Sequence, residues 1–167
     1  RQLPMPPRLY LMLSQHVGAP ARPVVLVGQK VLKGELIAAA QGNISAPLHA
    51  PTSGVISAVS EIAAPHASGL PAMAIAIDAD GEDRWIDSER PNDPYALAPA
   101  DIANRVAAAG VVGLGGATFP SSVKLNLGRR SSIDTLIING SECEPYLSCD
   151  DRLMRDRAAE IVSGIRL

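Results

Sequence analysis

The pattern of hydrophobic and turn-forming residues changes once along this chain of 167 residues. From about 23 to 86, short runs rich in valine and isoleucine, such as PVVLV and GVISAV, alternate with clusters of Gly, Pro, Asn and Ser. Short strands at such close spacing are typical of a small sandwich or barrel. After Tyr95 the spacing becomes helical. The sequence therefore predicts a small β domain followed by a unit of the α/β class.

A stretch rich in Pro, Asp and charge, DADGEDRWIDSERPNDP (78–94), separates the two parts and has little periodicity. We expect an N-terminal extended segment, a β barrel-sandwich, a linker and an α/β unit, at 1–22, 23–86, 87–98 and 99–167. Trp85, the only tryptophan of the chain, is expected to pin the linker to a core.

The α/β unit is predicted to combine helices with one strand. PADIANRVAAAG (99–110) begins with proline and ends at glycine, which are common helix boundaries. FPSSVKLNL (119–127) predicts one or two helical turns opened by Pro120. DTLIING (134–140) is an apolar run ending in Asn-Gly, which predicts a buried strand.

A final helix is predicted to begin near Asp150 or Asp151, because apolar residues recur at helical spacing from there on. Two pairs of opposite charge at i,i+4 lie on its outer side, Asp151–Arg155 and Arg152–Asp156. The helix reaches Leu167 with no stop signal, so we expect the chain to be a fragment of a longer protein.

Composition excludes several classes of function. The net charge is -2, no Lys/Arg-rich run is present and the aromatic fraction is 3%, so we expect no nucleic-acid partner. No apolar stretch approaches the roughly 20 residues that cross a bilayer, and no secretory signal is visible.

Cysteine and histidine spacings give no metal site. Cys143 and Cys149 are separated by five residues, which is not a usual zinc or iron–sulfur spacing. We expect two free thiols in a reducing compartment, with a disulfide as the open alternative. The three histidines, His16, His49 and His66, are scattered and are expected in loops or at the surface.

The segment VGQKVLKGELIAAAQGNISAPLHAPTSGVISAV (27–59) resembles the biotinyl/lipoyl carrier family. That resemblance implies a flattened barrel of two interlocked hairpins with a modified lysine at one hairpin tip. The tip here falls near 42–44 and holds no lysine, while Lys30 and Lys33 come too early. We therefore expect a structural barrel or docking module and no covalent cofactor.

GVVGLGGATFPSSVK (110–124) contains four glycines within seven residues. It lacks the G-x-x-x-x-G-K-[ST] order of a P-loop. It also lacks the third glycine of a dinucleotide fingerprint, and a helix precedes it where a strand is needed. Glycines nevertheless let a charged or planar ligand approach the backbone, and Lys124 can add a full positive charge to the amides and helix start.

A second polar cluster, NGSECEPY (139–146), follows the predicted strand. Asn139 is expected at the carboxyl end of that strand, where open α/β sheets hold ligands. Glu142 and Glu144 would repel phosphate, but they suit ribose hydroxyls, an amide or flavin N–H groups. The two clusters together predict a nucleotide or flavin site.

These motifs resemble a known family. GLGGATFPSSVK is similar to the G-x-G-G-A-G-F-P-x-x-x-K loop of the flavin-binding subunit of respiratory complex I, and NGSECEPYLSCDDRLM to its N-x-[DS]-E-x-E-P motif. A barrel followed by this flavin half is the order in the C subunit of the Rnf ion-translocating electron transport complex. Arginine and glycine of the complex I loop are replaced here by Leu114 and Thr118, which puts the nicotinamide side in question.

The resemblance implies a set of cofactor contacts. The glycine loop and its lysine would cradle the phosphate and ring of FMN, Asn139 and Glu142 would contact the flavin, and Glu144 would lie toward NADH. No catalytic side chain and no metal ligand are expected in this chain. The expected cofactor-binding residues are Gly113, Gly115, Gly116, Ala117, Phe119, Lys124, Asn139, Glu142 and Glu144.

The resemblance also implies a role. The implied role is that of an electron-transfer subunit of a membrane-associated, ion-translocating NADH:ferredoxin-type oxidoreductase. The implied location is the cytoplasmic face of the bacterial inner membrane. Partners would be NADH, ferredoxin and the integral and ferredoxin-like subunits, with 4Fe-4S clusters in a part beyond Leu167, so this fragment alone would be inactive. Two alternatives stay open: a docking scaffold of the complex, and a soluble flavoprotein like cobalamin reductase, which the barrel disfavours.

Overall fold

The computed structural model describes residues 4–88, 91–114, 118–126 and 134–167. Its strands are β1 Arg8–Met12, β2 Arg22–Pro23, β3 Lys30–Val31, β4 Leu36–Ala39, β5 Leu48–His49, β6 Gly54–Ala63 and β7 Pro71–Ala79. Its helices are η1 Pro94–Ala96, α1 Pro99–Ala108, α2 Ser121–Leu125, α3 Cys149–Asp156 and α4 Ala158–Arg166. Within those ranges, no helix has the length and apolar character that crossing a membrane requires.

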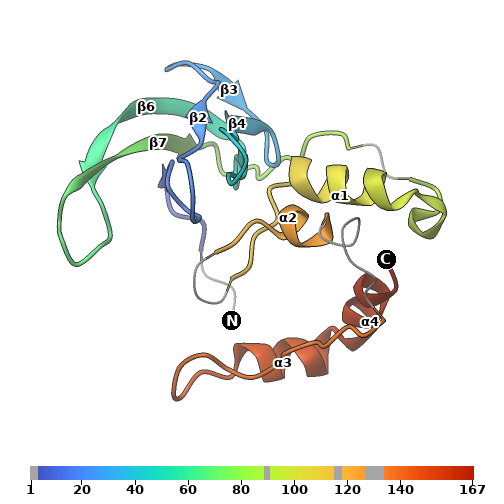
Figure 1. Ribbon diagram of the computed structural model, residues 1–167. Helices are drawn as coiled ribbons and strands as arrows, with labels where there is room; N and C mark the ends of the chain where they lie inside the picture. The colour runs from blue at the N-terminus through green and yellow to red at the C-terminus, as the bar shows by residue number, and fades with distance from the viewer. Residues whose placement is uncertain (1–3, 89–90, 115–117, 127–133) are drawn as a thin grey trace.

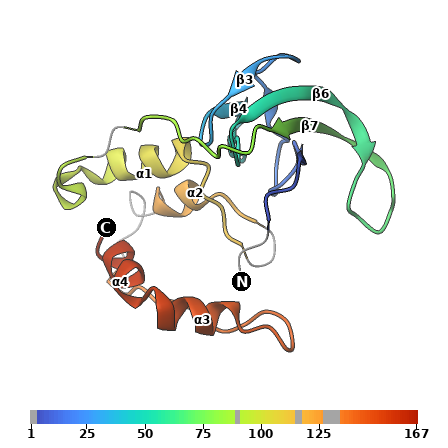
Figure 2. The ribbon, with the colours of Figure 1, turned by 180° about the vertical axis from the view of Figure 1, so that it is seen from behind.

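The strands form two antiparallel sheets, with orders β1-β7-β6-β3 and β2-β4-β5. β6 and β7 are the longest strands, and they pair from Gly54 and Ala79 at one end to Ala63 and Pro71 at the other. Both views show this pair as a curved ribbon that wraps part of the way around the smaller strands (Figures 1 and 2). The predicted small β domain is confirmed as a curled antiparallel sheet, and the two-hairpin carrier arrangement stays a prediction.

The hydrophobic core lies inside this curl. Its members are aliphatic side chains from both sheets, and burying them supplies the main driving force for folding. Ile37, Ile56, Ile75 and Ile77 are fully buried at its centre. The remaining members are Leu13, Ala21, Val25, Val31, Ala38, Leu48 and Ala50.

The N-terminal segment predicted as extended contributes β1, which pairs with β7 through Arg8 and Asp78 at one end. It leads to a histidine that lies in a loop, as expected, but whose side chain is buried there. His16 is 7% exposed, and its Nε2 atom lies 3.0 Å from the Ala46 backbone nitrogen. The ring is buried because it fills the space between two loops and pairs with a backbone amide that would otherwise lack a partner.

The linker begins as an extra strand-like segment on the barrel. The Lys33 amide donates to the Arg84 carbonyl at 2.8 Å, and the Ile86 amide donates to the Lys33 carbonyl at 3.0 Å. The backbone is therefore pinned as expected, but the Trp85 side chain is 66% exposed and does not enter a core. The Lys33 ammonium lies 5.0 Å from the centre of the Trp85 ring.

The second half is built from helices in the residues that the structure describes. α1 and α2 form where the sequence predicts them, and the single final helix is divided into α3 and α4 at Arg157, whose backbone is not helical (φ -126°, ψ 27°). The predicted buried strand at 134–140 is wrong: no strand forms there, and Ile137 is 83% exposed. A buried strand needs partners for its backbone and side chains, and the described residues offer none beside it.

The two halves meet where α1 ends. Gly110 has φ +68° and lies so close to the barrel that a Cβ atom there would come within 2.5 Å of the Pro47 carbonyl oxygen. The His49 ring lies beside the end of α1, where the Ala108 backbone acts to raise its pKa and burial acts more strongly to lower it. This contact fixes where the chain enters the glycine loop.

Candidate functional site

The glycine loop is closed at its base like a short hairpin. Val112 and Pro120 form an antiparallel bridge, the Gly113 amide donates to the Phe119 carbonyl at 2.9 Å, and the Ser121 amide donates to the Val111 carbonyl at 2.9 Å. The loop therefore leaves α1 and returns directly into α2, as Figure 1 shows. The predicted contacts Gly115, Gly116 and Ala117 lie outside the described residues.

Two residues of this loop differ from the complex I pattern, and the structure gives each a distinct environment. Leu114 is 93% exposed, so its side chain contributes little to packing in this part of the fold. Thr118 has φ +48°, the left-handed region in which a β-branched residue is an outlier. The backbone keeps a glycine-type conformation at Thr118 although the residue is not glycine.

Lys124 supplies the positive charge beside the loop. It lies in the last turn of α2, and its ammonium is 6.0 Å from the centre of the Phe119 ring. Within the described ranges, no carboxylate lies within 4.0 Å of it. α2 has only five residues, so its dipole adds little and Lys124 is the main source of positive potential.

The second motif is placed by a turn and a helix, and the strand expected before it is absent. The Asn139 side-chain oxygen accepts a hydrogen bond from the Ser141 amide at 2.9 Å, which forms a local turn. Gly140 packs against α3, where an added Cβ would lie 2.6 Å from the Met154 sulfur. Asn139 is exposed and therefore accessible to a ligand, but at a turn rather than at a strand end.

Glu142 caps α3 from outside the helix. Its Oε1 accepts hydrogen bonds from the amides of Asp150 at 2.8 Å and Asp151 at 3.0 Å, and its Oε2 accepts the Cys149 thiol at 3.3 Å. The Asp151 amide, with the Cys149 thiol and Asp150 amide, holds the pKa of Glu142 below its usual value. The same carboxylate raises the pKa of the Cys149 thiol. The capping role had no local sequence signal, because a capping box places its acid three residues after the N-cap.

Glu144 is the other carboxylate of the motif. Its side chain is exposed, and its carbonyl accepts a hydrogen bond from the Leu147 amide at 3.4 Å. Tyr146 next to it has φ +67° and is fully exposed. Glu144 is thus the more available carboxylate of the two.

The same loop brings three possible metal ligands, Glu142, Cys149 and Asp150, to within 4.8 Å of one another. The hydrogen bonds of the helix cap already account for this arrangement, so the cluster gives no reason to assign a metal. Both cysteines are free and exposed.

The structure builds the two motifs separately. Among the residues that it describes, no hydrogen bond or ion pair joins Lys124 or Phe119 to Asn139, Glu142 or Glu144. α4 returns toward the linker, where Tyr95 is hydrogen bonded to Ser163 and Arg166 lies 5.1 Å from the Tyr95 ring centre.

Comparison with known proteins defines the class of both halves. Residues 1–82 match the RnfC Barrel sandwich hybrid domain, and residues 106–167 match the Nuo51 FMN-binding domain. A barrel sandwich joined to an FMN-binding domain is the class of protein that this fold and these motifs define.

The chain belongs to the family of C subunits of the ion-translocating oxidoreductase complex. It is 58% identical over 98% of its length to such a subunit from Rhodobacter capsulatus, and 51% identical over 99% to one from Pseudomonas aeruginosa. The subunit from Salmonella arizonae is 48% identical over 100% of the chain. The chain spans 31%, 21% and 24% of the lengths of these relatives.

Proposed function

We propose that this chain forms the barrel and one wall of an FMN site in an electron-transfer subunit that takes electrons from NADH. The observation that carries the proposal is the glycine loop, closed at its base by the Val112–Pro120 bridge and followed by Lys124, within the FMN-binding match. The barrel match at 1–82 and the relatives' name favour this function over that of a cobalamin-reductase-like flavoprotein.

The described residues fit the phosphate end of FMN. An ammonium without a carboxylate beside it can bind a phosphate, and the closed base of the loop lies beside this ammonium through Phe119. The atom nearest to a Cβ added at Gly113 would be the Phe119 carbonyl oxygen, at 3.8 Å, which is an ordinary van der Waals contact and no clash.

The second motif also fits an FMN site, with different roles for Glu142 on one side and for Glu144 and Asn139 on the other. Because both oxygens of Glu142 accept hydrogen bonds within the protein, Glu142 shapes the motif more than it offers a free carboxylate. Glu144 and Asn139 are exposed and carry the polar groups that remain for the nucleotide. FMN, when bound, supplies the conversion between two-electron chemistry with NADH and single-electron transfer to iron–sulfur clusters.

The names of the relatives support a proposal about partners and location. The proposed partners are the other subunits, both integral and ferredoxin-like, with ferredoxin as electron partner and the cytoplasmic face of the inner membrane as location. The 4Fe-4S clusters are proposed for the part of the subunit that the relatives have in addition, and the fragment alone is proposed to be inactive.

FMN binding to the full-length subunit tests this function. We expect Lys124→Ala to weaken FMN binding about tenfold or more, because a charge-assisted contact to phosphate is lost. Lys30→Ala, which removes an exposed lysine from β3, is the matched control and should leave binding unchanged. Flavin absorbance after reconstitution measures both, and equal flavin content in the two variants would refute the role of Lys124.

A further inference from the structure

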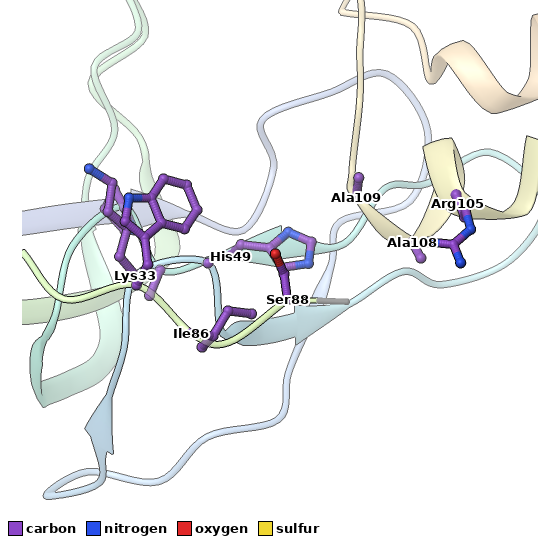
Figure 3. Close-up of a pocket in the computed structure, with 11 residues that line it drawn as sticks. Lys33, His49, Ile86, Ser88, Arg105, Ala108 and Ala109 are labelled. Carbon is purple, nitrogen blue, oxygen red and sulfur yellow. The ribbon is translucent and has the colours of Figure 1, made fainter. Parts of the chain in front are cut away.

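A cavity of about 720 Å³ lies between the barrel and the end of α1, with a lining that ends at Ala109, just before the glycine loop begins. Figure 3 shows Lys33 at one end of it, Arg105 at the other, and His49 and Ile86 between them. Its wall is mostly apolar and is contributed by the barrel, the linker and α1. The lining residues that matter here are Lys33, His49, Pro51, Trp85, Ile86 and Arg105.

Trp85 presents an exposed indole from a rigid backbone. Hydrogen bonds between Lys33 and residues 84 and 86 fix the segment on the barrel, yet the side chain is 66% exposed. Large aromatic side chains on a fixed backbone lose little conformational entropy when they are covered by another molecule. Trp and Arg are also the residue types that most often dominate the energy of protein interfaces.

The charged residues that line the cavity are both positive. The Lys33 ammonium is already paired with Asp83 at 2.7 Å, whereas Arg105 has no carboxylate within 4.0 Å among the described residues. An occupant with one negative group would therefore find its partner at Arg105, on the exposed surface of α1.

The inner part of the cavity does not suit a phosphate group. It adjoins the carboxyl end of α1, where the carbonyls carry partial negative charge. Burial lowers the pKa of His49, which keeps its ring neutral at pH 7. The cavity thus favours an apolar group inside and a carboxylate at the edge, which are features of a protein segment rather than of a nucleotide.

We propose that this cavity is the docking site for a segment of another subunit of the complex. That segment presents an apolar side chain to Trp85 and Ile86 and a carboxylate to Arg105. The relatives are named as subunits of a complex, so other subunits are available to supply such a segment. The proposal does not depend on the FMN site, which is built from other residues.

A photocrosslinker placed at position 85 tests the proposal in the assembled complex with the full-length subunit. We expect a crosslink to another subunit, at a segment with an apolar residue next to Asp or Glu, identified by mass spectrometry. A crosslink only to the rest of the same chain, or none, would overturn the proposal.

Affinity measurements give a second, independent readout. Trp85→Ala and Arg105→Glu should each weaken binding of the full-length subunit to the remaining subunits by about tenfold or more. Leu70→Ala, an equally exposed apolar residue on the barrel, and Lys30→Glu are the matched controls. FMN content should stay unchanged in all four variants, which shows that they are folded.

Unchanged affinity of both Trp85→Ala and Arg105→Glu would refute the docking role. Adding AMP or ADP to the wild-type complex tests the alternative occupant. If either nucleotide bound at low micromolar concentration and Trp85→Ala abolished that binding, the cavity would be a nucleotide site and the docking proposal would be wrong.

Discussion

Thr118 combines a β-branched side chain with a left-handed backbone, φ +48°. Such a conformation costs about 1–3 kcal/mol and persists only where the surrounding structure imposes it. Here the closed base of the loop, with Gly113 bonded to Phe119, imposes it from the neighbouring residue. The backbone angle at residue 118 is therefore set by this contact rather than by the preference of threonine.

Thr118→Gly should stabilise the protein, because glycine adopts this angle without strain. The gain is reduced by the greater entropy of glycine in the unfolded chain, which leaves about 1 kcal/mol. Thermal unfolding should show a higher melting temperature for this variant. Thr135→Gly, at an exposed position outside helices and strands, is the control and should not raise it; a melting temperature lower than wild type for Thr118→Gly would contradict the strain argument.

Glu142 caps the start of α3 through hydrogen bonds from its first amides. Because its lowered pKa comes first from the Asp151 amide, the cap is present above the unfolded pKa of about 4.5 and is lost as the pH falls through the lower folded value. Glu142→Ala should therefore speed hydrogen exchange of the Asp150 and Asp151 amides at pH 7. Glu144→Ala should not, since its side chain does not bond to the helix; equal exchange in wild type and Glu142→Ala would rule out the cap.

At the scale of the element, β6 and β7 are held together by a close approach at Gly54. An added Cβ would lie 2.1 Å from the Asp78 carbonyl oxygen, which no flexible side chain can relieve. Gly54→Ala should therefore push the strands apart and cost about 1–3 kcal/mol, as overpacking of a core does. Chemical denaturation should show this as a lower midpoint.

Gly164 in α4 is the matched control for that substitution. Nothing lies within 4 Å of a Cβ added there, so Gly164→Ala should only improve helix propensity, by about 0.5–1 kcal/mol. Opposite signs for the two Gly→Ala changes would separate close packing from propensity, and a stabilised Gly54→Ala protein would disprove the strand contact.

Elements whose signals are local were predictable from the sequence. α1 is bounded by Pro99 and Gly110, and the ion pairs of α3 follow from i,i+4 spacing. The absence of a strand at 134–140 was not predictable. Whether an apolar run is buried depends on distant partners that the run itself does not specify. The burial of the His16 side chain in its loop was not predictable for the same reason, since its contact with Ala46 joins residues 30 positions apart.

Parts of the candidate site were also predictable from local patterns, and other parts were not. The glycine loop, Lys124 and the alternating glutamates were visible as patterns, whereas the capping bonds of Glu142 span seven to nine residues and carry no motif. The junction cavity was also missed, and an isolated tryptophan in a polar linker was the one signal that pointed to it.

At the scale of the whole molecule, the barrel and the flavin half are linked at a junction whose packing sets the start of the glycine loop. Gly110 rests on the Pro47 carbonyl, and three residues later Gly113 begins the closed loop. His49 lies in this junction, where it lines the same cavity as Ala108. The protonation state of His49 therefore depends on the contact between the two halves and also changes the stability of that contact.

Two effects oppose each other at His49. A positive ring at the carboxyl end of α1 would be favoured by the helix dipole and by the Ala108 carbonyl, but burial penalises the charge more strongly, so the pKa falls below 6.5. Between the folded pKa and 6.5 the unfolded chain binds a proton that the folded protein does not. Stability contributed by His49 is therefore complete above pH 6.5 and declines as the pH falls toward the folded value.

Titration of the histidine ring signals by NMR should give His49 a midpoint below 6.5. The melting temperature should fall less between pH 7 and pH 5 in His49→Gln than in wild type, because glutamine has no proton to bind. The same substitution at exposed His66 is the control and should leave the pH dependence as it is. A His49 midpoint above 6.5 would mean that the helix end outweighs burial, and that the junction strengthens rather than weakens on acidification.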